Sequence, residues 1–180
     1  MPARLSPIRM PPRFFSLSLF LFAVIFPDIA RSQEIPPTEE TAAAHLDASP
    51  RHGEWVEYDA GDGDMVRAWV VYPERSDGAP VVLVIHEIYA LTDWIRGVAD
   101  QLAADGFIAV APDLISGKGP GEGGSESVDR QGAVALIRSL DPQEVTRRLK
   151  AAADYGTDLP AATDAVGTWH PTINGPFWVG

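Results

Sequence analysis

The sequence feature that most limits how this chain can fold is the run VVLVI at residues 81–85. All of its residues are apolar and all but Leu83 are β-branched. A strand with one face in water alternates apolar and polar residues, so an unbroken run favours a strand that is buried on both faces. Such strands belong to parallel sheets that are covered by helices. The run therefore predicts an α/β domain.

A helix and a second strand follow this run. Thr92 is a suitable N-cap and Gly106 a suitable stop after the last turn. Between them the apolar residues recur at helical spacing: Ile95, Val98, Ala99 and Leu102. Residues 107–111 (FIAVA) then supply another buried strand. Strand, helix and strand make a right-handed βαβ unit, which predicts a doubly wound, mostly parallel sheet.

The remaining elements are marked by turn and cap signals. Two β-rich runs, 54–59 and 65–72, flank the loop AGDGD and predict an amino-terminal β-hairpin. A short helix is expected over 129–139. A longer one is expected from Asp141, which begins a D-x-x-E capping box with Pro142 in the first helical position, to Gly156. Residues 165–167 (AVG) have the composition of one further strand.

The first 32 residues have the pattern of a secretory signal. Three arginines precede an apolar run at 14–26, and Ala30-Arg31-Ser32 offers small residues at cleavage spacing. We therefore expect export to the periplasm or the extracellular space, with no stable membrane span after cleavage. An uncleaved anchor is the alternative, but the run is short of the ~20 residues that span a bilayer.

Residues 33–51 are rich in Pro, Thr, Glu and Ala and predict a flexible linker to a domain over 52–180. His45 and His52 lie at this end of the chain and are interpreted as solvated side chains rather than as metal ligands.

The acidic balance excludes several partners. The formal net charge is −11, and removal of residues 1–32 takes away four arginines and one acid, which leaves −11 − 3 = −14. Such a surface repels phosphate, so nucleic acid binding is not expected.

The absence of cysteine excludes disulfides, thiolate metal sites and a cysteine nucleophile. The Gly-rich loop 116–127 lacks Walker spacing and predicts a mobile surface loop, and HEIYA lacks the second histidine of HExxH. No cofactor or metal is predicted.

Several segments in a fixed order resemble a known family. They are VIHEIYAL at 84–91, WIR at 94–96, LAADGF at 102–107, APDL at 111–114 and AAADY at 151–155. Together they resemble the amino-terminal half of a dienelactone hydrolase, with Ala90 where that family usually has glycine. The resemblance implies an α/β-hydrolase fold, truncated here after about the fifth strand, and a Cys-Asp-His triad acting on a small-molecule ester or lactone. In it, Glu87 is the partner of the nucleophile and the backbone N–H of Ile88 is an oxyanion-hole donor.

The chain departs from that family where the nucleophile belongs. A G-x-C-x-G or G-x-S-x-G elbow is expected after 165–167, but residues 168–180 read TWHPTINGPFWVG. Pro171 and Pro176 would interrupt the strand and the helix of an elbow, so we expect the strand beyond Gly167 not to form and apolar faces to stay uncovered. His170 is out of chain order for the family histidine.

Ser116 and Thr172 are interpreted as loop residues, because no base is placed beside either by the sequence. We therefore predict a truncated or frameshifted hydrolase without a nucleophile and without activity. The alternative is an exported, non-catalytic binding module on the same fold, which would be stably folded.

Overall fold

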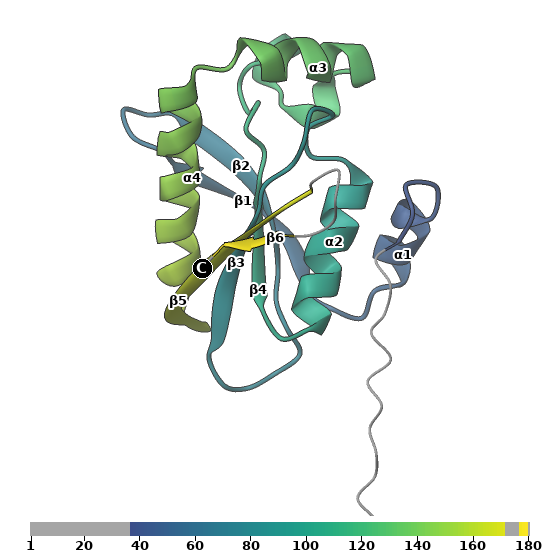
Figure 1. Ribbon diagram of the computed structural model, residues 1–180, viewed down its shortest axis with the longest axis vertical. Coiled ribbons are helices and arrows are strands. Elements are labelled where there is room, and N and C mark those ends of the chain that lie inside the picture. The colour runs from purple at the N-terminus through teal and green to yellow at the C-terminus, as the bar shows by residue number, and fades with distance from the viewer. Residues whose placement is uncertain (1–36, 172–176, 180) are drawn as a thin grey trace, which may run out of the picture. The chain divides into compact units, whose positions relative to one another are not determined.

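The computed structural model describes residues 37–171 and 177–179, in which one mixed sheet forms the centre (Figure 1). The strands lie in the order β1-β2-β4-β3-β5-β6. Their bounds are β1 Gly53–Asp59, β2 Met65–Val71, β3 Ala79–Val84, β4 Ile108–Pro112, β5 Ala162–His170 and β6 Phe177–Val179. The predicted signal over 1–32 lies outside the described residues.

The hairpin prediction is confirmed, whereas the prediction of a mostly parallel sheet is wrong. β1 and β2 pair antiparallel from Gly53↔Val71 to Asp59↔Met65. β3 is parallel to β4 and to β5, but β2 pairs antiparallel with β4, and β6 antiparallel with β5. Only the central strands are joined by the long crossovers that parallel pairing needs. The hairpin adds at one side of them, with β2 running opposite to its neighbour β4.

The helices that follow Thr92 and Asp141 begin where the sequence places their caps. α1 is Ala42–Ala48, α2 Asp93–Ala104, α3 Arg130–Ser139 and α4 Pro142–Thr157. Thr92 Oγ1 accepts the N–H of Ile95 at 3.4 Å, and Asp141 accepts the N–H of Gln143 at 2.6 Å. The carboxylate of Glu144, the last residue of the expected capping box, is engaged by Lys118 at 2.7 Å and by Arg148 at 3.2 Å.

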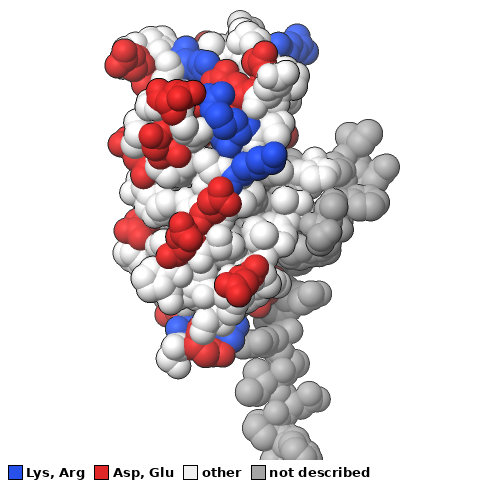
Figure 2. Space-filling model, turned by 90° about the vertical axis from the view of Figure 1, so that its left-hand side faces the viewer, with Lys and Arg blue, Asp and Glu red and all other residues white. Residues whose placement is uncertain are grey.

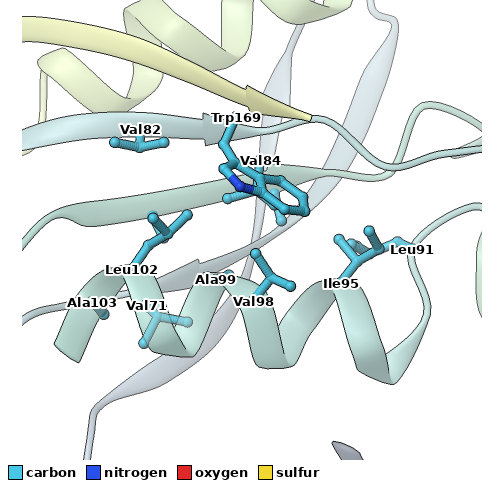
Figure 3. Packing of buried hydrophobic residues seen from close by; sticks show 12 residues of the cluster. Val71, Val82, Val84, Leu91, Ile95, Val98, Ala99, Leu102, Ala103 and Trp169 are labelled. Carbon is cyan, nitrogen blue, oxygen red and sulfur yellow. The ribbon is translucent and has the colours of Figure 1, made fainter. Parts of the chain in front are cut away.

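Helices cover both faces of the sheet, as the buried strands predict. On one face, α2 packs its apolar side against Val82 and Val84 of β3 and against Trp169 of β5 (Figure 3). On the other face, α4 covers Val81 and Leu83. Alternate residues of one strand therefore belong to different cores, which is why the run at 81–84 contains no polar residue.

The amino-terminal part of the domain differs from its sequence prediction. Instead of a flexible linker throughout 33–51, residues 42–48 form helix α1, which contacts α2. Asp100 of α2 is buried and accepts hydrogen bonds from His45 at 3.0 Å, from Ser49 at 2.5 Å and from Arg51. The interpretation of His45 as a solvated side chain is therefore wrong. Local composition missed this packing because the carboxylate that organises it lies about 50 residues away.

β5 also extends further than expected. The strand continues past Gly167 to His170, with Val81↔Val166 and Val84↔Trp169 as parallel partners on β3. Trp169 is 8% exposed and lies in the core under α2. The hydrogen bonds offered by β3 and the burial of this indole favour an extended chain up to Pro171. The expectation that no strand forms there is wrong, although Val166 remains 44% exposed.

One face of the molecule carries charges of both signs. Figure 2 shows, on the side that lies at the left in Figure 1, several acidic side chains and fewer basic ones among uncharged residues. No helix among the described residues is long and apolar enough to cross a membrane.

Candidate functional site at the strand ends

The carboxyl ends of β3, β4 and β5 meet at one edge of the sheet because these strands run parallel. In open α/β sheets this edge is where ligands bind. It brings together His86, Glu87 and Ile88 after β3 with Asp113 and Leu114 at the end of β4, all of which the sequence singled out.

His86 joins two of these strand ends and is structural. Its Nε2 accepts the backbone N–H of Leu114 at 3.1 Å, so its proton resides on Nδ1, which donates to the carbonyl of Glu87 at 3.0 Å. The side chain is buried, and burial lowers its pKa. Both ring nitrogens are thus used in holding the turn, and the neutral imidazole is the form that this geometry requires.

Glu87 projects from the same turn into a pocket of about 430 Å³. Its carboxylate accepts the N–H of Tyr89 at 3.1 Å. Burial raises the pKa of Glu87, against the opposing effects of the backbone N–H groups of Tyr89 and Ile88 and of the Arg130 guanidinium. A half-buried carboxyl group with a raised pKa, in a pocket at the strand ends, is typical of a group that takes part in proton chemistry. Ile88 is half-buried beside it, on the backbone segment expected to supply an oxyanion donor.

Asp113 anchors the Gly-rich loop rather than facing a ligand. It is buried, and it accepts both the N–H and the hydroxyl of Ser125 at 2.7 Å. A side chain at Gly124 would place its Cβ 2.2 Å from Asp113 Oδ2, so the loop can approach this closely only with glycine. Ser125 in turn accepts the N–H of Leu91. The loop, predicted as a mobile surface feature, is tied to the strand ends at this point.

The hydroxyl groups considered as nucleophiles do not complete a site. Ser116 is buried, donates to the carbonyl of Asp113 at 2.8 Å and accepts the N–H of Arg67 at 3.0 Å, which confirms it as a loop residue. Thr172 lies outside the described residues. His170 is half-buried at the last position of β5, and β6 pairs antiparallel with the end of that strand. Among the described residues, the chain after β5 therefore reverses direction and forms β6.

Three pocket residues were missed by the sequence analysis. They are Glu39, Tyr89 and Arg130, which come from the amino-terminal segment, the β3 turn and α3. The rest of the lining is Glu87, Thr92, Trp94 and Pro171. The guanidinium of Arg130 lies 3.6 Å from the ring centroid of Tyr89, and Arg130 Nη1 is 2.6 Å from Glu39 Oε1. No local pattern connects three segments so far apart in the chain. No group of three or more His, Cys, Asp or Glu that could hold a metal occurs in the part of the chain that the structure describes.

A mixed sheet with helices on both faces, and with its candidate groups beyond the carboxyl ends of its parallel strands, defines an α/β-hydrolase-type protein. The model of the dienelactone hydrolase family matches residues 66–169, more than half of the chain, and the chain belongs to this family.

Individual relatives agree with this assignment. Carboxymethylenebutenolidase 1 of Cupriavidus pinatubonensis is 31% identical over 113 residues, which are 62% of this chain and 48% of that enzyme. The hydrolase fragment YghX of Escherichia coli is 31% identical over 69% of this chain and 97% of its own length. Among solved structures, a dienelactone hydrolase-like promiscuous phosphotriesterase from metagenomic libraries has a TM-score of 0.56 at 25% identity, over 67% of this chain and 48% of that one. The chain thus spans about half the length of the Cupriavidus enzyme and of the phosphotriesterase.

Proposed function

We propose that this chain carries the half of an ester or lactone hydrolase site that polarises the substrate carbonyl. The observation that supports it is the turn after β3, which places Glu87 in the pocket with the backbone of Ile88 beside it. Attack on an ester builds negative charge on the carbonyl oxygen, and a prepositioned backbone N–H stabilises that charge by a few kcal/mol. The name of the Cupriavidus relative, a carboxymethylenebutenolidase, supports a lactone as the substrate class.

In this proposal Glu87 controls the protonation of an attacking group. Its raised pKa lets the carboxyl group exist in both protonation states nearer to neutral pH than an exposed glutamate does. A carboxylate beside a thiol or hydroxyl can accept its proton and hold it until the substrate binds. The chain lacks cysteine, and no serine follows residue 139. The carbonyl-polarising half of the site therefore has no sulfur nucleophile, and no serine near the end of β5.

We expect the purified chain to be inactive for this reason. Loss of a triad removes several powers of ten in rate, and binding with a partial oxyanion hole retains only a remnant. Turnover of p-nitrophenyl acetate by the full chain should equal that of a heat-treated control, and a fluorophosphonate probe should leave the chain unlabelled. Esterase activity above that control which is lost in Glu87→Gln but kept in the exposed-residue variant Glu57→Gln would contradict the inactivity. Labelling by the fluorophosphonate probe would reveal a nucleophile.

Export is part of the same proposal. It is supported by the arginines and the apolar run of residues 1–32. Expression of the full coding sequence in a Gram-negative host, followed by fractionation and amino-terminal sequencing, tests it. A processed product in the periplasm that begins near Gln33 is expected, and an unprocessed product in the cytoplasm would contradict export.

A further inference from the structure

The pocket at the strand ends is lined on one side by Glu39, which lies on a turn of the amino-terminal segment. Residues 38–41 form this turn, in which Thr41 N–H donates to the Thr38 carbonyl at 3.1 Å and Thr38 N–H donates to Thr41 Oγ1 at 3.0 Å. The turn is braced on both sides. Pro37 is buried against Gly97 of α2, where a Cβ would lie 2.6 Å from the proline ring, and Ala42 is fully buried at the start of α1. The chain is thus held in place while the turn itself faces outward.

Glu39 is carried by this turn and pairs with Arg130 across the pocket. Glu39 Oε1 lies 2.6 Å from Arg130 Nη1, and both side chains line the pocket with Glu87. The two side chains are 61% and 54% exposed. An exposed ion pair of this kind adds little to stability, so its partners can be exchanged without unfolding.

The charges around the pocket make this exchange selective. Among the described residues that line it, Arg130 is the only cation, while Glu39 and Glu87 both carry carboxyl groups. Any anionic ligand entering the pocket therefore has one guanidinium to pair with, and that group is already engaged. The two carboxylates also repel an anionic ligand, because like charges interact unfavourably.

We infer that Glu39 is an internal carboxylate that competes with carboxylate-bearing small molecules for Arg130 and so limits their entry to the pocket. The guanidinium of Arg130 stacks on the ring of Tyr89, whose centroid is 3.6 Å away. This cation–π contact keeps Arg130 in position when its ion-pair partner changes. Displacement of Glu39 by the carboxylate of a ligand replaces one ion pair with another and leaves the braced turn intact. This inference concerns binding and does not depend on ester turnover.

Benzoate and its neutral analogue benzamide test this role by NMR titration of the full chain. Glu39→Gln should bind benzoate about two- to five-fold more tightly than the parent chain, the factor that an exposed ion pair supplies, with shifts at Tyr89 and Arg130. Its affinity for benzamide should not change. Arg130→Gln should lose benzoate binding. Asp47→Asn is the matched control, because it removes the same charge from an exposed position of α1 away from the pocket.

Each outcome decides the matter. Tighter benzoate binding in Glu39→Gln but not in Asp47→Asn supports competition by Glu39. Equal gains in the two variants would mean that only net charge matters, and retained binding in Arg130→Gln would place the ligand elsewhere; either result overturns the inference. Failure of both the parent chain and Glu39→Gln to bind benzoate overturns it as well. Thermal unfolding of every variant, which should match the parent because these side chains are exposed, guards against misfolding.

Discussion

Ala90 has a backbone conformation that most residues avoid. Its φ is +63°, in the left-handed region, and its side chain is fully buried with Ile115 and Ala133. A residue with a Cβ pays about 1–2 kcal/mol for this conformation. The turn nevertheless needs it, because Ala90 N–H bonds to the carbonyl of Glu87 and thereby closes the loop that carries the candidate site. Glycine, which the family resemblance leads one to expect at this position, would adopt the left-handed conformation without that cost.

Substitutions at Ala90 should separate backbone strain from packing. Ala90→Gly relieves the strain but loses a buried methyl group and gains freedom in the unfolded chain, so its stability should stay within about 1 kcal/mol of the parent. Ala90→Val adds a branched side chain to a left-handed position in a filled cluster and should cost at least about 2 kcal/mol. Urea unfolding of the variants measures both values. Equal stability of the valine and glycine variants would show that the left-handed turn is not kept in solution.

At the scale of elements, α4 packs tightly against the sheet at Gly156. A Cβ at this position would lie 2.7 Å from Val81 Cγ1 and 3.2 Å from Val110 Cγ2. These valines belong to β3 and β4, the two buried strands that carry the candidate site at their ends. Glycine is a poor helix former, so its presence inside the last turn of a 16-residue helix reflects this close packing.

Gly156→Ala should therefore destabilise the domain although alanine is the better helix former. Helix propensity favours the change by about 1 kcal/mol, but an added methyl group in a filled core costs about 1–3 kcal/mol. We expect a net loss of up to about 2 kcal/mol in the free energy of unfolding. Asp154→Ala, at an exposed position of the same helix, serves as the control and should change stability by less than about 0.5 kcal/mol. A gain in stability for Gly156→Ala would mean that α4 lies further from the sheet.

At the scale of the whole molecule, a half-buried carboxylate, Asp64, and a buried one, Asp100, connect distant segments. Asp64 in the hairpin loop pairs with Arg148 of α4, which also donates to the carbonyls of Leu114 and Ser116. Asp100 connects the amino-terminal segment to α2. Hydrogen bonds from Arg148 lower the pKa of Asp64. Burial opposes ionisation of Asp100, but hydrogen bonds from Arg51 and Ser49 outweigh it and lower the pKa of this group as well.

These shifts predict how stability depends on pH. A carboxyl group whose pKa is lower in the folded state than in the unfolded state stabilises the fold above its unfolded pKa of about 4, and this contribution is lost as pH falls through the folded value. Asp100→Asn should lower the free energy of unfolding at pH 7 by about 1–3 kcal/mol, because buried donors lose their charged acceptor. The difference from the parent should shrink below about pH 4. Asp47→Asn should leave the profile unchanged, and a constant difference between parent and Asp100→Asn at all pH values would contradict the assignment.

The candidate site was predictable in part. Glu87 and Ile88 follow a buried strand, so their position at the ligand-binding edge was visible in the sequence, and the family resemblance supplied their proposed roles. Glu39, Tyr89 and Arg130 could not be found in this way, because a surface ion pair and a cation–π contact leave no periodic signal.

The sequence by itself determined the elements whose signals are local: the runs at β3 and β4, the hairpin, and the helices capped by Thr92 and Asp141. These features depend on hydrophobic periodicity and on side chains that bond to backbone groups a few residues away. Only the tertiary structure decided that β5 reaches His170, that α1 forms at all, and that Glu39 meets Arg130. In each of these cases the stabilising partner lies far along the chain, so the local sequence alone favours no single conformation.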